Sequence, residues 1–167
     1  SLSSEFHLSN CRRIWKDSER EFQEATGATP STQAENIKHI DFFLKDKKID
    51  VKGLKKSQLN GYVLVELLNV QGNAGWASLF SDCTHIAFRM PKGIYPDHFI
   101  LVEKTDLRLK TLELCGIYQE ANRNLRASKD GYEKVKNKYI GRKNRLDVFC
   151  YIESKYLYEL DHEIILV

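Results

Sequence analysis

Beyond residue 38 the sequence consists largely of short runs in which apolar residues alternate with polar ones or follow each other directly. Such runs, bounded by glycine, proline and asparagine, are typical of β-strands. The runs that predict strands are 39–44, 48–54, 61–70, 84–90, 97–107, 147–153 and 162–167. The run 61–70 is rich in valine and leucine, so we expect this strand to be covered on both faces and to lie in the centre of its sheet.

Helical periodicity occurs in two places. Residues 10–26 carry an apolar stripe at helical spacing, Asn10 can cap the start of this helix, and Gly27 can end it. A shorter helix is expected at Leu107–Leu114, whereas residues 27–35 are expected to form a loop. A first helix followed mostly by strands predicts a layered, mixed α/β fold and not a barrel.

The composition is that of one globular domain. The chain has 167 residues, of which 42% are apolar and 29% charged, so a single domain over residues 1–167 can bury a sizeable core. No apolar run is long enough to cross a bilayer, and the first residues lack the pattern of a secretory signal. We therefore expect a cytoplasmic protein with no membrane partner. The cysteines, at positions 11, 83, 115 and 150, lack the spacing of a zinc site and are expected to be reduced thiols.

Positive charge is concentrated in one segment of the chain. Residues 123–145 contain nine Lys or Arg and two acidic residues, a local excess of seven, although the whole chain has a net charge of only +3. Clustered cations favour a polyanion partner such as nucleic acid, because binding releases condensed counterions. A solvated surface would have the same composition, and for a basic run taken alone it is the more common explanation.

The strands expected at 39–44 and 48–54 are joined by a lysine-rich turn and form a hairpin with two different faces. Alternation places Asp50 and Lys52 on one face of the second strand. Asp41 lies on the same face of the hairpin if the turn has an even number of residues. The other face is apolar and carries Ile40, Phe42, Leu44, Ile49 and Val51.

Two carboxylates and an ammonium on one face are a candidate metal centre. Neighbouring carboxylates repel each other, and one of them stays protonated unless a cation intervenes. Oxygen ligands of this kind suit Mg²⁺, which keeps several waters and accepts phosphate oxygens as further ligands. Lys52 can then hold a water beside the metal or stabilise charge on a phosphate. In the simpler alternative, these charges form a surface salt bridge.

The arrangement resembles the signature of the PD-(D/E)XK nuclease superfamily, with Asp41 as the first aspartate and Asp50-Val51-Lys52 as the Asp-x-Lys element. The residue before Asp41 is isoleucine, where the signature has proline. Two stretches extend the resemblance to phage-encoded and mobile-element members, and they read KIDVKGLKK and VLVELLNVQGNAGWASLFSDCTHIAF. The resemblance covers about the middle third of the chain. It implies a restriction-endonuclease-like αβββαβ core, with a mixed central sheet flanked by helices.

The resemblance leaves two assignments of the acidic residues open. In the first, the signature is Asp41, Asp50 and Lys52, and a further acid, Glu66, is an accessory metal ligand. In the second, Asp50 is the first aspartate and Glu66 the second acid. Leu68 then stands where members often have lysine, and Lys52 substitutes from the neighbouring strand. We favour the first assignment, because it retains a lysine in the signature.

Several residues have both a functional and a structural interpretation. Members often place a glutamate of the first helix near the metal, which makes Glu21 a candidate ligand, with Glu24 as second choice; a solvated helix face would also explain both. For Glu66 the structural alternative is an edge position or pairing with a lysine of segment 45–56. We expect Trp76 to close the core, although an aromatic residue can also stack on a base.

The leading interpretation is a metal-dependent DNA phosphodiesterase with endonuclease activity. Asp41 and Asp50, together with Glu66, would bind Mg²⁺ or Mn²⁺. Lys52 would assist the attacking water. The basic segment would hold the DNA backbone, and its expected contacts are Lys138, Arg142, Lys143 and Arg145. Cutting of both strands favours a homodimer.

Two other classes of function stay open. A nucleic-acid-binding module on the same fold, with a decayed catalytic centre, is favoured by Leu68. An α/β protein with an ordinary charged hairpin is the third class. It would bind no metal and would show no affinity for DNA that falls steeply with salt.

Overall fold

The computed structural model describes residues 16–68, 75–78, 81–115, 138–140 and 148–167, apart from the side chains of 68, 138–140 and 148. The helices are α2 (Asp17–Thr26), α3 (Gln33–Ile37), α4 (Lys56–Leu59), α5 (Lys104–Cys115) and α6 (Lys155–Glu159). The strands are β1 (Thr29–Pro30), β2 (Phe42–Leu44), β3 (Lys47–Lys52), β4 (Tyr62–Leu68), β5 (His85–Met90), β6 (His98–Glu103), β7 (Lys138–Ile140), β8 (Val148–Glu153) and β9 (His162–Leu166). They form a mixed α/β fold with two sheets.

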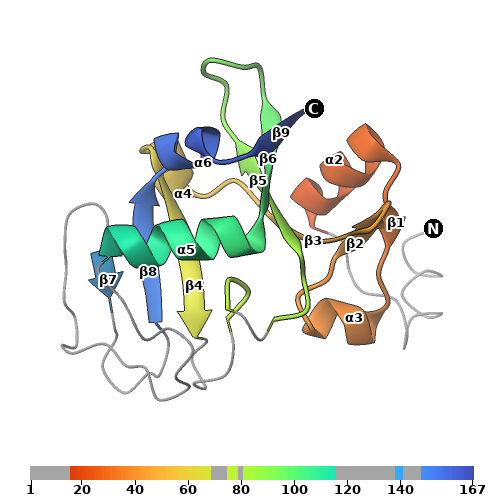
Figure 1. Ribbon diagram of the computed structural model, residues 1–167. Helices are drawn as coiled ribbons and strands as arrows, with labels where there is room; N and C mark the ends of the chain where they lie inside the picture. Colours follow the sequence, from red (N-terminus) through yellow and green to blue (C-terminus); the bar gives the residue numbers. More distant parts are fainter. Residues whose placement is uncertain (1–15, 69–74, 79–80, 116–137, 141–147) are drawn as a thin grey trace.

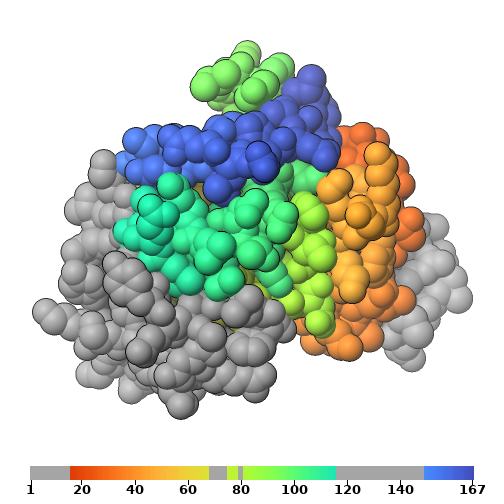
Figure 2. All heavy atoms as spheres, viewed as in Figure 1, coloured from red at the N-terminus to blue at the C-terminus, as the bar shows by residue number. Residues whose placement is uncertain are grey.

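The larger sheet has six strands in the order β1-β2-β3-β5-β6-β9. Its neighbouring strands are antiparallel except for β3 and β5, which are parallel. The edge strand β1 has two residues and includes Pro30, whereas β9 at the other edge has five. The loop between β5 and β6 stands clear of the body of the molecule (Figure 2). The expectation of a mixed central sheet flanked by helices is confirmed.

The smaller sheet has the order β4-β8-β7 and contains the strand expected at 61–70. Among the strands that the structure describes, β4 lies at an edge of this sheet, antiparallel to β8, so the expectation of a central strand was wrong. Its buried side chains are Val63, Val65 and Leu67, and the residues between them are half-buried. The run looks continuously apolar because Leu64 also packs against the same core from a half-buried position.

The hairpin expected over 39–54 is formed by β2 and β3. Leu44 pairs with Lys47, so the turn between the strands has two residues, Lys45 and Asp46. Lys45 has a φ of 57°, the positive value that the favoured two-residue hairpin turns need at their first position. The even-numbered turn on which the shared acidic face depends is therefore present.

Two of the helices agree with the sequence pattern. α2 confirms the later part of the helix expected at 10–26, but the expected start was wrong, because α2 begins at Asp17 and Lys16 before it is extended (φ −81°, ψ 161°). Gly27 ends α2 with a φ of 69°, and its N–H donates to the carbonyl of Gln23 at 2.7 Å. α5 confirms the helix expected at 107–114 and begins earlier.

The loop expected at 27–35 was wrong, because this stretch contains β1 and the start of α3. α3 begins with a capping box in which the N–H of Thr32 donates to Oε1 of Glu35 at 2.8 Å. In return, the N–H of Glu35 donates to Oγ1 of Thr32 at 3.3 Å. Among the helices that the structure describes, none combines the length and apolar character that crossing a membrane requires.

Two hydrophobic cores lie on the two faces of the larger sheet. Under α2, Phe22 packs against Phe42 and Phe99, with ring centroids 5.5 and 5.2 Å apart. On the other face, β5 and β6 pack against the smaller sheet, α5 and α6. Figure 1 shows α2 and the smaller sheet on opposite sides of β3 and β5, and Figure 2 shows α5 and the chain after residue 148 covering the core.

Candidate functional site

The β2–β3 hairpin places two acidic residues next to each other. Phe42 pairs with Ile49, and this register sets Asp41 opposite Asp50. Both acids are buried, each with only 5% of its surface exposed. Asp50 pairs with Ile86 of β5, which belongs to the core that faces the smaller sheet. The acids therefore lie on one face of the hairpin, as the alternation predicts, and the smaller sheet covers that face.

The opposite face of the hairpin is apolar, also as expected. Phe42, Ile49 and Val51 belong to the core under α2, and Leu44 packs against them. A slip of the strand register by one residue would exchange the two faces and bury the charged side chains in this core. Burial of the apolar face therefore holds the acids in place.

Asp41 is held by neutral donors. Its Oδ2 accepts a hydrogen bond from the backbone N–H of Val51 at 2.7 Å, and its Oδ1 accepts one from the side-chain amide of Asn36. Asn36 lies on α3, in the part of the chain next to the expected loop. Donors on two different elements fix the orientation of this carboxylate, which is a requirement for a preorganised site.

Asp50 has a strongly perturbed carboxyl group. Burial raises its pKa to about 7; the charge of Lys52 opposes this rise, and the charge of Asp41 and a hydrogen bond with it add to the rise. Its Oδ2 lies 3.3 Å from Nζ of Lys52 and 4.0 Å from Nδ1 of His39. The ammonium is at ion-pair distance, and among the residues described this buried oxygen has no hydrogen-bond partner. The atom can therefore accept a further cation.

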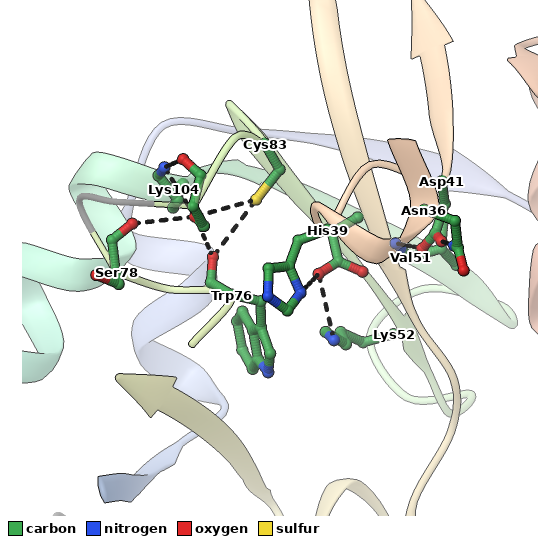
Figure 3. Close-up of polar contacts among 11 residues, drawn as sticks. Asn36, His39, Asp41, Val51, Lys52, Trp76, Ser78, Cys83 and Lys104 are labelled. Carbon is green, nitrogen blue, oxygen red and sulfur yellow. Dashed lines mark hydrogen bonds and ion pairs between the residues drawn. The ribbon is translucent and has the colours of Figure 1, made fainter. Parts of the chain in front are cut away.

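Lys52 lies between the acid pair and an aromatic ring (Figure 3). Its Nζ is 4.6 Å from the centre of the Trp76 indole. Trp76 is buried and meets Phe88 edge-on, with ring centroids 5.9 Å apart, so the expectation that it closes the core is confirmed. The side chain of Lys52 keeps 23% of its surface exposed. Solvent therefore reaches the site at this lysine.

Glu66 lies on β4 in the smaller sheet and is half-buried. Burial and the charge of Lys52 lower the pKa of Lys55, and the charge of Glu66 opposes them. Lys55 is therefore close enough to Glu66 for a charge interaction, and β4 is an edge strand. The edge position in the structural alternative for Glu66 is thus present among the described strands. In the ranges that the structure describes, no group of three or more His, Cys, Asp or Glu is arranged to hold a metal ion.

Glu21 lies on the other side of the larger sheet. Its carboxylate oxygens are 3.2 and 3.3 Å from Nε and Nη2 of Arg89, a two-point ion pair. Arg89 pairs with Phe99, which belongs to the core under α2. The sheet therefore separates Glu21 from Asp50, and the structure does not bring the expected helix glutamate to the acid pair.

The expected DNA contacts cannot be placed in the fold. Arg142, Lys143 and Arg145 lie outside the described residues. Lys138 is described only in its backbone, as the first residue of β7, and the side chain of Leu68 is likewise outside the description. The roles assigned to these residues stay predictions.

Two further residues belong to the site: Asn36, which donates to Asp41, and His39, which lies beside Asp50. His39 has a φ of 68°, which is unusual for a residue with a side chain, and this conformation brings its imidazole to Asp50. A histidine in a strand-like run gives no sign of a left-handed backbone, so its place here could not be inferred. Asn36 could have been found, because the Thr-x-x-Glu pattern that begins α3 is visible in the sequence.

Comparison of the chain with protein-family models, with curated proteins and with solved structures finds no match. The chemistry of the site is therefore argued from its own residues. A buried carboxyl pair beside a lysine can bind a small divalent cation, and the ammonium can stabilise an anion bound next to that cation.

Proposed function

We propose that the protein is a divalent-metal-dependent phosphodiesterase that cleaves DNA. The observation that carries the proposal is the placement of Asp41, Asp50 and Lys52 on one face of the hairpin, with the ammonium 3.3 Å from Asp50. The resemblance of these residues to the PD-(D/E)XK signature supports DNA as the substrate class and a restriction-endonuclease-like core as the fold. The excess of positive charge at 123–145 supports a polyanionic substrate.

The residues of the site fit a small, hard dication. Two carboxyl groups supply oxygen atoms, the ligands that Mg²⁺ and Mn²⁺ prefer. Oδ2 of Asp50 is buried and forms no hydrogen bond within the described residues, so it has an acceptor site for a cation. A dication would offset the burial penalty and the repulsion from Asp41 that together raise the pKa of Asp50. We assign Asp41 and Asp50 as ligands and keep Glu66 as an accessory candidate.

Each residue of the site then has a role. The bound dication supplies Lewis-acid activation of a water and neutralises phosphate charge. Lys52 adds a positive charge at the solvent-accessible side of the acid pair, where it stabilises charge that develops on the phosphate. Asn36 and the Val51 N–H keep Asp41 in one orientation, so the carboxylate does not have to be ordered during the reaction.

The test is cleavage of supercoiled plasmid and of branched DNA in Mg²⁺ or Mn²⁺. We expect the wild type to cut at least one of these substrates. Asp50→Asn preserves the shape of the side chain and removes its charge, and it should lower the rate at least about a hundredfold. Asp46→Asn is the matched control, because it removes the same charge from the exposed turn of the same hairpin, and it should leave the rate unchanged.

Two results would contradict the proposal. Cleavage that survives Asp50→Asn would place the chemistry at another site. DNA binding without cleavage of any of these substrates would favour a binding module whose catalytic centre has decayed.

A further inference from the structure

Lys52 contacts both a carboxylate and an aromatic ring, and a metal would affect these two neighbours differently. Its Nζ lies 3.3 Å from Oδ2 of Asp50 and 4.6 Å from the centre of the Trp76 ring. A dication bound to Asp50 competes with the ammonium for the charge of the same carboxylate. The face of an indole attracts an ammonium but has no oxygen atom to offer to Mg²⁺. The cation–π contact between Lys52 and the Trp76 ring can therefore persist when the carboxylate of Asp50 binds a metal ion.

We propose that Trp76 is the positioning residue for Lys52, and that its indole ring keeps the ammonium beside the acid pair when Asp50 binds a dication. This inference rests on the proposed function and deepens it. Trp76 is buried and acts on the reaction only through Lys52. This role requires more than filling the core, because any apolar side chain of similar volume can fill a core, whereas the contact with Lys52 requires an aromatic face.

The backbone on both sides of Trp76 is bound to β4. The N–H of Gly75 donates to the carbonyl of Leu67 at 2.9 Å, and the N–H of Ala77 donates to the carbonyl of Glu66 at 3.0 Å. A Cβ atom at Gly75 would lie 2.6 Å from the carbonyl oxygen of Glu66, so this close approach requires glycine. The indole is thus carried by a backbone segment that is fixed to a strand.

The carbonyl of Trp76 is bound from a second direction (Figure 3). It accepts hydrogen bonds from Oγ of Ser81 at 2.9 Å and from Sγ of Cys83 at 3.4 Å. Lys104, a buried residue at the start of α5, donates to the carbonyl of Ser81 at 2.9 Å and to its hydroxyl at 3.0 Å. A ring fixed in this way can order a flexible lysine, because the ring itself loses no further freedom when the ammonium binds.

Tryptophan emission reports this contact directly. The chain has two tryptophans, so Trp15→Phe leaves Trp76 as the single emitter. In that background Lys52→Met should shift the emission of Trp76, and the difference should persist in saturating Mg²⁺. Lys48→Met is the matched control, since Lys48 is exposed on the same face of β3, about 13 Å along the strand, and it should leave the emission unchanged.

A double-mutant cycle shows whether the ring acts through Lys52. Trp76→Leu removes the π face, and it should lower kcat about tenfold with little change in KM. Trp76→Phe keeps an aromatic face and should restore most of the rate. In the Lys52→Met background, Trp76→Leu should have no further effect on kcat. The same cycle on the unfolding equilibrium constant should show a coupling of about fivefold.

Additive effects in the cycle, or an emission spectrum that Lys52→Met leaves unchanged, would overturn the inference. The emission measurement needs no substitution of Trp76, so it does not depend on the folding of the Trp76→Leu variant. The emission measurement and the unfolding measurement can also be made on a chain that does not cleave DNA. A chain that fails to cut DNA but shows the coupling would therefore refute the proposed function and leave the contact intact, whereas a cutting chain without the coupling would refute the positioning role alone.

Discussion

Asp50 shows how burial of one residue changes the pH dependence of the whole chain. Its pKa is about 7 in the folded chain, mainly because it is buried, and its ordinary value is 3.8. Between these values the folded state keeps a proton that the unfolded state releases. The stability that this proton contributes is fully present below the lower value and is lost as the pH rises through the higher one.

We expect the free energy of unfolding of the wild type, measured relative to Asp50→Asn, to fall by a few kcal/mol between about pH 4 and about pH 7.5. Asparagine carries no titrating proton, so the variant lacks this contribution. Denaturant titrations at the two pH values measure the difference, with Asp46→Asn as the exposed control. Added Mg²⁺ should reduce the fall, because it stabilises the charged carboxylate. A difference that does not change with pH would contradict the expectation.

Substitution of Glu21 should not affect cleavage as substitution of Asp50 does, because the partner of Glu21 is Arg89 on the other face of the sheet. We expect Glu21→Gln to leave metal-dependent cleavage within about twofold and to lower the free energy of unfolding by about 1 kcal/mol or less. Cleavage rates and urea titrations measure the two effects, with the exposed Glu24→Gln as control. If cleavage were lost while stability stayed intact, Glu21 would have to be counted as part of the metal centre.

The shared face of Asp41, Asp50 and Lys52 could be predicted because side chains alternate along a strand with a fixed period of two. The position of His39 could not be predicted, because its place beside Asp50 depends on a backbone with positive φ, and the surrounding sequence does not indicate such a backbone. Trp76 was predicted to close the core, but its contact with Lys52 depends on the path of the chain between β4 and β5. A path of this kind is set by tertiary packing and has no period to detect.

At the scale of the elements, the close approach of Gly75 to β4 determines where Trp76 lies. We expect Gly75→Ala to lower the free energy of unfolding by about 1–3 kcal/mol, because its Cβ would meet backbone atoms of Glu66 at 2.6 and 2.8 Å. Gly93→Ala is the control, since the nearest atom to its Cβ is 4.0 Å away in an exposed turn. Urea titrations compare the two. Equal stabilities of the two variants would show that the chain relaxes around Gly75 without loss.

The strands could be predicted better than the short helices. Strands of six residues are long enough to show a pattern, either the alternation of β3 or the apolar run of β5, whereas α3, α4 and α6 have only four or five residues and no complete amphipathic pattern. Such helices depend on caps and tertiary contacts; the capping box of α3 is one example. β4 was predicted as a strand but placed in the centre of its sheet, because the half-buried Leu64 between the buried Val63 and Val65 makes the run look continuously apolar.

For the molecule as a whole, the division into two sheets could not be predicted. Val65 of β4 pairs with Cys150 of β8, and the chain between them includes two strands of the larger sheet. Local patterns identify strands but not partners that are distant in sequence. The face on which the acid pair meets the smaller sheet is a result of this pairing.

Under the proposed function, the uneven charge of the chain predicts that affinity for DNA falls steeply with salt. Replacing four cations of the basic segment by glutamine should weaken binding and make the slope of log K against log salt shallower by up to about 3.6. The four residues are Lys138, Arg142, Lys143 and Arg145. Fluorescence anisotropy with labelled DNA at several salt concentrations measures the slope. The control replaces the exposed lysines 45, 48, 92 and 155, and an equal change in that variant would contradict a localised contact.

The two edges of the larger sheet differ in what they offer to another molecule. At β1 an incoming strand would meet only two residues, one of which, Pro30, has no N–H to share. At β9 it would meet five residues without proline. Of the two edges that the described strands form, β9 is therefore the better template for a strand of another molecule. A second copy that paired there across a twofold axis would leave the two β1 edges outermost, and these edges disfavour the addition of further copies.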